Sequence, residues 1–419
     1  ASDVYKRQEY AYRLSVDESP VLEAVVPCAV EPGKTNRLTL FGRGLPGSKP
    51  SQLKAADGGA LEELEVQLEV PASADISGAD GPVATAASGL RTFSYRYRSG
   101  SGVSNPVELA LVEGSVLAVQ SSGGTPPTAA AFVGFPGVAS GLFGKGLQGV
   151  PFEFDAKKGD SVVAEVFSQR LGFGATNSYL RLSKDGAHLA EAYGPDLNVG
   201  GPRLNTLHND ATLKFEVKED GKHTLHLSDL SGASRPGLGA PYTVVLRKAQ
   251  PGFALLAATE PPIEKADDRQ ILPRGAVLRA GGTAAMRVLA FRRDGFDKEI
   301  VLSAEGLPAG VSCDTTRILA GKNEGVLIFR TEPGAVRNIA EVRIVGRSED
   351  GKIESVARGA TARWVVPDYN TAVGEMRLTR GNGVVVATTD ANAPLSLTPT
   401  TEGPVQVEAG AKVEVALRV

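Results

Sequence analysis

The feature that most constrains this fold is a two-residue alternation of apolar and polar side chains, broken at short intervals by glycine-containing turns. It is clearest between Pro151 and Leu182, where Phe152, Phe154 and Ala156 alternate with Glu153 and Asp155. A turn with Gly159 follows, and the alternation then resumes at Val162, Ala164 and Val166. Because successive side chains of a strand point to opposite faces, this period predicts β-strands with one buried and one wet face.

Length and composition extend this prediction to the whole chain. With 419 residues, the chain is too long for one β-sandwich core, and about three domains are expected. The 49 glycines and 26 prolines suit a turn-rich all-β protein. Six Asp-Gly pairs are further turn signals. The predicted fold class is therefore all-β, with tandem β-sandwiches of immunoglobulin-like and jelly-roll-like type, truncated at both ends.

Shifts in pattern divide the chain into expected units. The prediction for the segment with Leu61, Leu64 and Leu68 is a strand, although these leucines also fit one helical face. Residues 1–8 resemble translated adapter sequence and are left out of the fold prediction. The expected units are a lone last strand in 9–19, a sandwich in 20–112, a central sandwich in 113–248, a third sandwich in 249–366, and the start of a further module in 367–419.

Internal repetition supports the last boundary. The segment from Leu278 to Val288 and the segment from Val407 to Leu417 share one pattern: a strand, an Ala-Gly turn and a second strand. Residues 367–419 are therefore expected to open a second copy of the third unit. Tandem modules on short linkers are the expected organisation, with Ser121 to Pro127 as one small-residue linker or loop.

Several motifs between Ser104 and Asp229 resemble the bacterial pre-peptidase C-terminal domain, a jelly-roll-like β-sandwich appended to secreted peptidases and large surface proteins. The resemblance is carried by the following segments: Ser104 to Val107, Phe152 to Gly159, Arg170 to Gly172, Asp220-Gly221 and Ser228-Asp229. Residues 9–16 look like the last strand of an earlier copy. The first unit, with Thr39 to Gly47, resembles an immunoglobulin-like TIG module. The third, with Arg292 to Phe296 and Gly306 to Val311, is similar to immunoglobulin-like segments that accompany such domains.

The resemblance implies a secreted location (extracellular, cell-surface or periplasmic). It also raises the question of calcium, because related collagen-binding modules bind calcium through acidic residues. Members of the family carry acidic motifs at two places where this chain has Ser121 to Thr125 and Gly149 to Pro151. A hard cation needs six or more oxygen ligands, and carboxylates are missing from both places. No cofactor is therefore expected. The net charge of −3 predicts neither nucleic-acid binding nor attraction to an anionic membrane.

The catalytic and metal motifs of the chain are weak. Two G-x-G-x-x-G matches, Gly42 to Gly47 and Gly144 to Gly149, lead into no helix and are interpreted as turns. His223 and His226, three apart on a strand, face opposite sides, with His223 inward beside Leu225. Cys28 and Cys313 are interpreted as small buried hydrophobes. No Gly-x-Ser-x-Gly elbow occurs.

A candidate binding surface consists of aromatic and arginine side chains near loops at the ends of the sandwiches. Its members are Tyr95 and Tyr97 in the first unit, and Arg170, Phe173 and Tyr179 in the central unit. Loops at a sandwich end commonly carry binding, and aromatic residues with arginine suit a polysaccharide or an extracellular protein. The alternative is that these aromatic side chains fill or cover the hydrophobic core and bind nothing.

The sequence therefore predicts a non-catalytic segment of a secreted or surface bacterial protein that serves spacing, adhesion or substrate attachment. The alternative is the accessory carboxyl-terminal region of a secreted peptidase or other hydrolase, whose catalytic domain is encoded elsewhere in the gene. A catalytic triad in the adjoining reading frame would favour the alternative. No enzyme is expected within these residues.

Overall fold

The computed structural model describes residues 18–72, 85–119, 131–144, 149–174, 176–201, 204–231, 237–259, 270–271, 275–368, 371–378, 383–395, 398–400, 405, 407 and 412–418. Within these ranges the chain is all-β, and its helical elements are the 3-10 turns η2 (Thr85–Gly89) and η3 (Gln169–Leu171). The predicted fold class of tandem β-sandwiches is thereby confirmed. The expected strand at 9–16, the segment 1–8 and the linker 121–127 lie outside the described residues.

The first unit packs two small sheets against each other. Its larger sheet has the order β1 (Val21–Val26), β3 (Thr35–Arg43), β5 (Ala60–Glu69) and β4 (Lys49–Lys54). Its smaller sheet has the order β2 (Ala29–Val30), β9 (Val107–Leu111) and β6 (Thr92–Tyr95), and β7 (Arg98–Ser99) forms a hairpin with β8 (Gly102–Val103). The predicted strand over Leu64 to Leu68 is confirmed as part of β5.

The central unit is a sandwich of two five-stranded sheets. One sheet has the order β10 (Val116–Ala118), β12 (Gly137–Leu142), β19 (Pro241–Lys248), β14 (Ser161–Phe167) and β17 (Thr212–Glu216). The other has the order β11 (Ala131–Phe132), β13 (Val150–Ala156), β18 (Gly221–Asp229), β15 (Ser178–Lys184) and β16 (Ala187–Ala192). Pairing is antiparallel except for β10 with β12 and β11 with β13.

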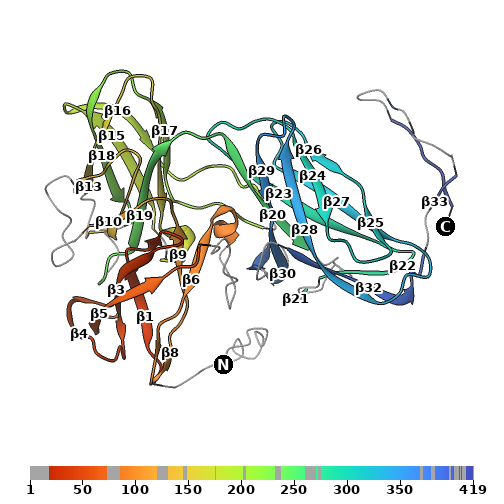
Figure 1. Cartoon of the computed structure of the whole chain (residues 1–419), viewed down its shortest axis with the longest axis horizontal. Coiled ribbons are helices and arrows are strands. Elements are labelled where there is room, and N and C mark those ends of the chain that lie inside the picture. The colour runs from red at the N-terminus through yellow and green to blue at the C-terminus, as the bar shows by residue number, and fades with distance from the viewer. Residues whose placement is uncertain are drawn as a thin grey trace.

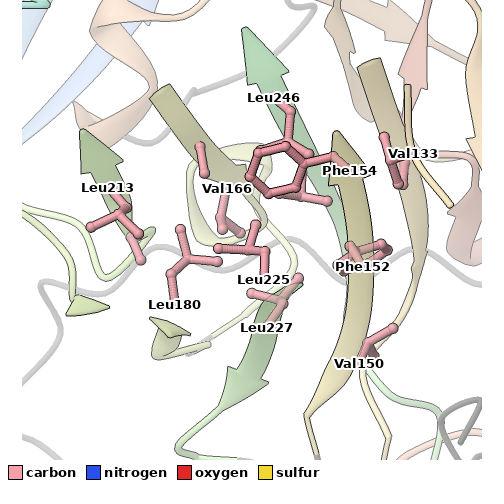
Figure 2. Close-up of a cluster of buried hydrophobic side chains, with 14 of the residues drawn as sticks. Val133, Val150, Phe152, Phe154, Val166, Leu180, Leu213, Leu225, Leu227 and Leu246 are labelled. Carbon is pink, nitrogen blue, oxygen red and sulfur yellow. The ribbon is translucent and has the colours of Figure 1, made fainter. Parts of the chain in front are cut away.

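The core of the central unit follows the alternation of the sequence. Phe152, Phe154 and Ala156 of β13 are buried, whereas Asp155 is exposed. Figure 2 shows side chains from several strands converging on one another in this core: Val133, Val150, Phe152, Phe154, Val166, Leu180, Leu213, Leu225, Leu227 and Leu246. Gly159 adopts φ 90° in the turn between β13 and β14, as that turn requires. The predicted in-and-out pattern of this unit is confirmed.

The third unit has the largest sheets. One contains β21 (Gln270–Ile271), β30 (Arg358–Asp368), β20 (Gly252–Thr259), β23 (Thr283–Arg293), β27 (Glu324–Thr331) and β25 (Val311–Cys313), with β31 (Thr371–Leu378) paired to β30. The other contains β22 (Ala276–Ala280), β32 (Val384–Asn392), β28 (Asn338–Ser348), β24 (Ile300–Glu305) and β26 (Thr316–Ile318), with β29 (Glu354–Val356) paired to β28.

The third unit extends past the expected boundary at residue 366. β32 lies within the residues expected to open a further module, yet it is hydrogen-bonded between β22 and β28. Its Val384 and Val386 are buried in the third core. The in-and-out burial pattern of β32 is that of any half-buried strand, so only its pairing shows to which sheet it belongs. Beyond it, β33 (Thr398–Pro399) pairs with β34 (Leu417–Arg418).

The three units adjoin one another directly. In Figure 1 the first and central units lie together at the left, and the third unit lies at the right. Between the first and central units, the backbone N–H of Cys28 donates to Ser140 Oγ at 3.0 Å, and Cys28 Sγ lies 3.1 Å from Thr243 Oγ1. All three groups are buried. Where the units meet, apolar residues of all three pack together: Ala87, Leu204, Leu256, Leu289 and Ala360. The expected short linkers are therefore accompanied by packed interfaces.

Candidate binding surface

Tyr179 lies on the outward face of the central unit, in β15. Its hydroxyl donates to Glu191 Oε2 at 2.6 Å, and its ring centroid lies 4.9 Å from that of Tyr193, with the planes inclined by 38°. The bond to the Glu191 carboxylate, aided by partial burial, raises the pKa of Tyr179 to about 12. Tyr193 follows β16 directly and is 52% exposed. The two rings form an aromatic pair that the core does not use.

Polar and charged groups surround this aromatic pair. Arg181 stands opposite Glu191 in the register between β15 and β16, and His226 of β18 stands opposite Arg181 on the other side. His188 Nε2 lies 4.0 Å from Glu191 Oε2. The sequence predicts Tyr179 as part of a surface but not Tyr193 or Glu191, because their proximity to Tyr179 depends on the antiparallel pairing of β15 with β16.

Arg170 is buried, although the sequence predicts it on the candidate binding surface. Its side chain is only 8% exposed, and its Nε donates to Asp210 Oδ2 at 3.0 Å. Nη1 and Nη2 each donate to Glu165 Oε1 at 3.2 Å, and Nη2 also donates to the carbonyl of Val166. The guanidinium is thus held inside the fold.

Asp210, which no sequence motif marks, organises the turn that carries Arg170. Its carboxylate is fully buried and accepts hydrogen bonds from the backbone N–H groups of Ser168, Gln169 and Arg170, at 3.2, 2.8 and 3.1 Å. The carboxylate therefore fixes the backbone of this turn as well as the side chain of Arg170. Asp210 and Arg170 are 40 residues apart, so no local motif reveals the pair.

Phe173 and the tyrosines of the first unit are half-buried and pack at the boundary between units. Phe173 contacts the cores of both the first and central units. Tyr95 and Tyr97 pack against the first core, and the Tyr97 hydroxyl donates to the carbonyl of Pro46 at 3.4 Å. β6 ends at Tyr95, so Tyr97 lies beyond the strand. The structure brings Tyr179 to Tyr193, and it does not bring the five predicted residues to one patch.

His208 adjoins the Asp210 turn, where the backbone N–H of Asp210 donates to His208 Nδ1 at 3.2 Å. Burial, and then the positive charge of Arg170, lower the pKa of His208 from 6.5 to about 3. The folded state therefore holds a neutral imidazole over a range in which the unfolded chain binds a proton.

We expect His208 to make stability fall as the pH falls. Its contribution is complete above pH 6.5, the unfolded pKa, and is lost progressively as the pH drops toward 3. Linkage limits the loss between pH 7 and pH 5 to about 2 kcal/mol. Urea unfolding at these two pH values measures it, and His208→Gln is expected to remove that part of the pH dependence. An identical pH slope in the variant and the wild-type chain would contradict this assignment.

The histidines of β18 lie on opposite faces of their strand, and the two cysteines form no site. His223 is buried and stacks on Phe154 at 5.6 Å, whereas His226 is half-buried on the opposite face of β18, as predicted. Cys28 is buried, and burial raises the pKa of its thiol to about 11; Cys313 is half-buried. Among the described residues, no three His, Cys, Asp or Glu side chains gather as a metal site. In the same residues, no helix is long and apolar enough to cross a membrane.

Comparison with solved structures gives the following similarities. The pre-peptidase C-terminal domain of a collagenase from Bacillus anthracis matches at 14% identity over 29% of this chain and 98% of that domain, with a TM-score of 0.22. A protein from Eubacterium rectale described as secreted matches at 9% identity over 64% of this chain and 83% of its own, with a TM-score of 0.22.

Fibronectin(III)-like modules of CbhA from Clostridium thermocellum match at 11% identity over 56% of this chain and 92% of theirs, with a TM-score of 0.15. No protein-family model matches the chain, and no curated protein matches it. These comparisons assign the chain to no family.

Proposed function

We propose that this chain is a non-catalytic segment of a secreted or surface bacterial protein, and that it holds binding faces at fixed positions relative to one another. The observation that carries the proposal is the packing between units. Modules on flexible linkers transmit no orientation, whereas units joined by buried contacts keep one geometry. Such a body suits spacing, adhesion or attachment to a substrate.

The joint between the central and third units shows how the geometry is kept. Asp294, in the turn after β23, is paired through its carboxylate with Arg247 of β19 and accepts from the backbone N–H of Gln250 at 2.8 Å. Lys214 of β17 donates to the backbone carbonyl of Asp294 at 3.0 Å, and Arg287 donates to the carbonyl of Gly200 at 3.0 Å. Because these bonds approach from different strands, they restrain rotation as well as separation.

The joint between the first and third units is also buried. Arg358 of β30 is 5% exposed, and its Nη1 donates to the carbonyl of Leu90 at 2.9 Å. Burial lowers the pKa of Arg358 to about 10. Gly89 lies against Phe291, where an added Cβ would approach the ring to 3.0 Å. Together with Asp210 and Cys28, Arg358 is a buried polar group with a structural role, which supports the non-catalytic reading.

Small-angle X-ray scattering tests the proposal. We expect the wild-type chain to give the distance distribution of one body with fixed units. The double variant Asp294→Asn with Arg287→Gln removes side-chain bonds across the joint, and it is expected to broaden the distribution. Asp350→Asn is the matched control. Like Asp294, Asp350 belongs to an Asp-Gly turn and forms an ion pair, but its partner Lys298 lies in the same unit, so no bond across the joint is lost. A wild-type profile typical of independently moving units would overturn the proposal.

A further inference from the structure

We propose that the outward face formed by β15 and β16 binds a neutral polysaccharide chain. This face is defined here as Tyr179, Arg181, Leu189, Glu191 and Tyr193, and is called the tyrosine face. The inference rests on the proposed attachment role and adds a site and a ligand class to it. Figure 1 places β15 and β16 on the side of the central unit away from the third unit.

Strand geometry brings the members of the tyrosine face together. Glu191 and Tyr193 are two residues apart at the end of β16, so they point the same way, and Leu189 lies at the β-bulge in the pairing of β16 with β15. Ala190 and Ala192 between them face inward and pack on the core. Leu189 is 50% exposed and Tyr193 is 52% exposed. The core is therefore complete without these side chains, and their apolar surface is available outside.

The aromatic pair offers a flat apolar contact in a fixed position. The rings of Tyr179 and Tyr193 lie 4.9 Å apart, and the bond from the Tyr179 hydroxyl to Glu191 fixes one ring while the other is solvent-facing. Aromatic side chains lose little conformational entropy on binding because they rotate about two bonds. The C–H face of a sugar ring is an apolar surface of matching size, and its ring hydroxyls project sideways toward polar neighbours.

The charges on the face select a neutral ligand. Glu191 has one carboxylate and Arg181 one guanidinium, and the two stand opposite each other in the strand register. An anionic polymer would meet Glu191, and a basic peptide would meet Arg181. A hydroxyl-rich neutral chain can accept from the guanidinium and donate to the carboxylate, so both charges are satisfied by the same ligand.

The edge position of β16 suits a polymer rather than a small molecule. In the described part of the chain, β16 is the outermost strand of its sheet, beyond β15. A ligand that lies across the two tyrosines can extend past the edge of this sheet, because no further strand of the same sheet follows β16 in the described part of the chain. Contacts with a few sugar units would be repeated along the polymer, which raises the apparent affinity.

Affinity electrophoresis of the whole chain in native gels tests the inference. The gels contain soluble β-glucan, galactomannan or starch as neutral probes, with polygalacturonate as an anionic probe and gelatin as a polypeptide probe. We expect retardation by at least one neutral polysaccharide. Tyr193→Ala is expected to lower the apparent affinity at least ten-fold, whereas Tyr193→Phe keeps the ring and most of the affinity.

Leu319→Ala is the matched control, because Leu319 is a similarly exposed apolar side chain of the third unit. Thermal unfolding of Tyr193→Ala verifies that the variant is folded, and Glu191→Ala gives a second, independent loss. Retardation by polygalacturonate or gelatin alone, no retardation by any probe, or retardation unchanged by both variants would each overturn the inference. If scattering still shows one fixed body, the proposed function stands while the tyrosine face fails.

Discussion

Replacement of Asp210 by alanine is expected to destabilise the central unit by about 3–5 kcal/mol, which is the usual effect of leaving one partner of a buried ion pair alone. The substitution removes the acceptor of three backbone N–H groups and of Arg170 Nε at once. The guanidinium of Arg170 would keep its bonds to Glu165 and the Val166 carbonyl, but the backbone N–H groups of the η3 turn would lose their common acceptor. Urea unfolding followed by intrinsic fluorescence and circular dichroism measures the change.

Glu216→Gln is the control for Asp210→Ala. Glu216 belongs to the neighbouring strand β17 and pairs with Lys218 at 3.5 Å on the exposed surface. Exposed pairs contribute little because water screens them, so no measurable change is expected. Equal stabilities of Asp210→Ala and the wild-type chain would show that the buried pair does not hold the turn.

Replacement of Phe152 by alanine is the second prediction with a large effect, again about 3–5 kcal/mol. Its ring is fully buried in the central core and meets Tyr242 edge-on, with centroids 6.3 Å apart. Truncation leaves a cavity between two sheets that are each fixed by hydrogen bonds, so the site cannot collapse. Phe152→Leu keeps most of the volume and is expected to cost about 1 kcal/mol. The midpoint of urea unfolding distinguishes the two.

A substitution of Tyr242, whose ring meets that of Phe152, is expected to change the free energy of unfolding in the opposite direction. Tyr242 is fully buried, and its hydroxyl has no hydrogen-bond partner among the described residues. Burial accordingly raises the pKa of this phenol. Tyr242→Phe removes the uncompensated hydroxyl and keeps the ring, so stability is expected to stay the same or to rise by about 1 kcal/mol. A loss of more than that amount would mean that the hydroxyl has a partner in solution.

The candidate surface was only partly predictable from the sequence. The sequence predicts Tyr179 as an aromatic residue of a surface, and in the structure it lies on an outward face. Its partners Glu191 and Tyr193 come from the next strand, and the β-bulge between Leu182 and Ser183 shifts the register of that pairing. A shift of one residue moves every side chain to the other face. The composition of the face therefore depends on a detail that residue types do not encode.

Arg170 illustrates the same limit in the opposite direction. An arginine in a glycine-rich loop is typical of an exposed surface, and the sequence therefore predicts such a place for Arg170. The structure surrounds it with Asp210 and Glu165, two carboxylates placed by β14 and by the segment before β17. Burial of a guanidinium is stable only with such partners, and the partners are known only once the strands are paired.

From the sequence alone, the alternation of residues such as Phe152, Glu153 and Phe154 determined that this chain forms strands, which faces they bury, and that glycines such as Gly159 turn them. That information is local, because the two-residue period of a strand needs only its own neighbours. The tertiary structure alone decided that β32 completes the third unit, that Asp294 is paired with Arg247 across a joint, and that Cys28 lies against Thr243, 215 residues away. Contacts of this kind depend on which strands pair and in what register, and many pairings satisfy the same alternation.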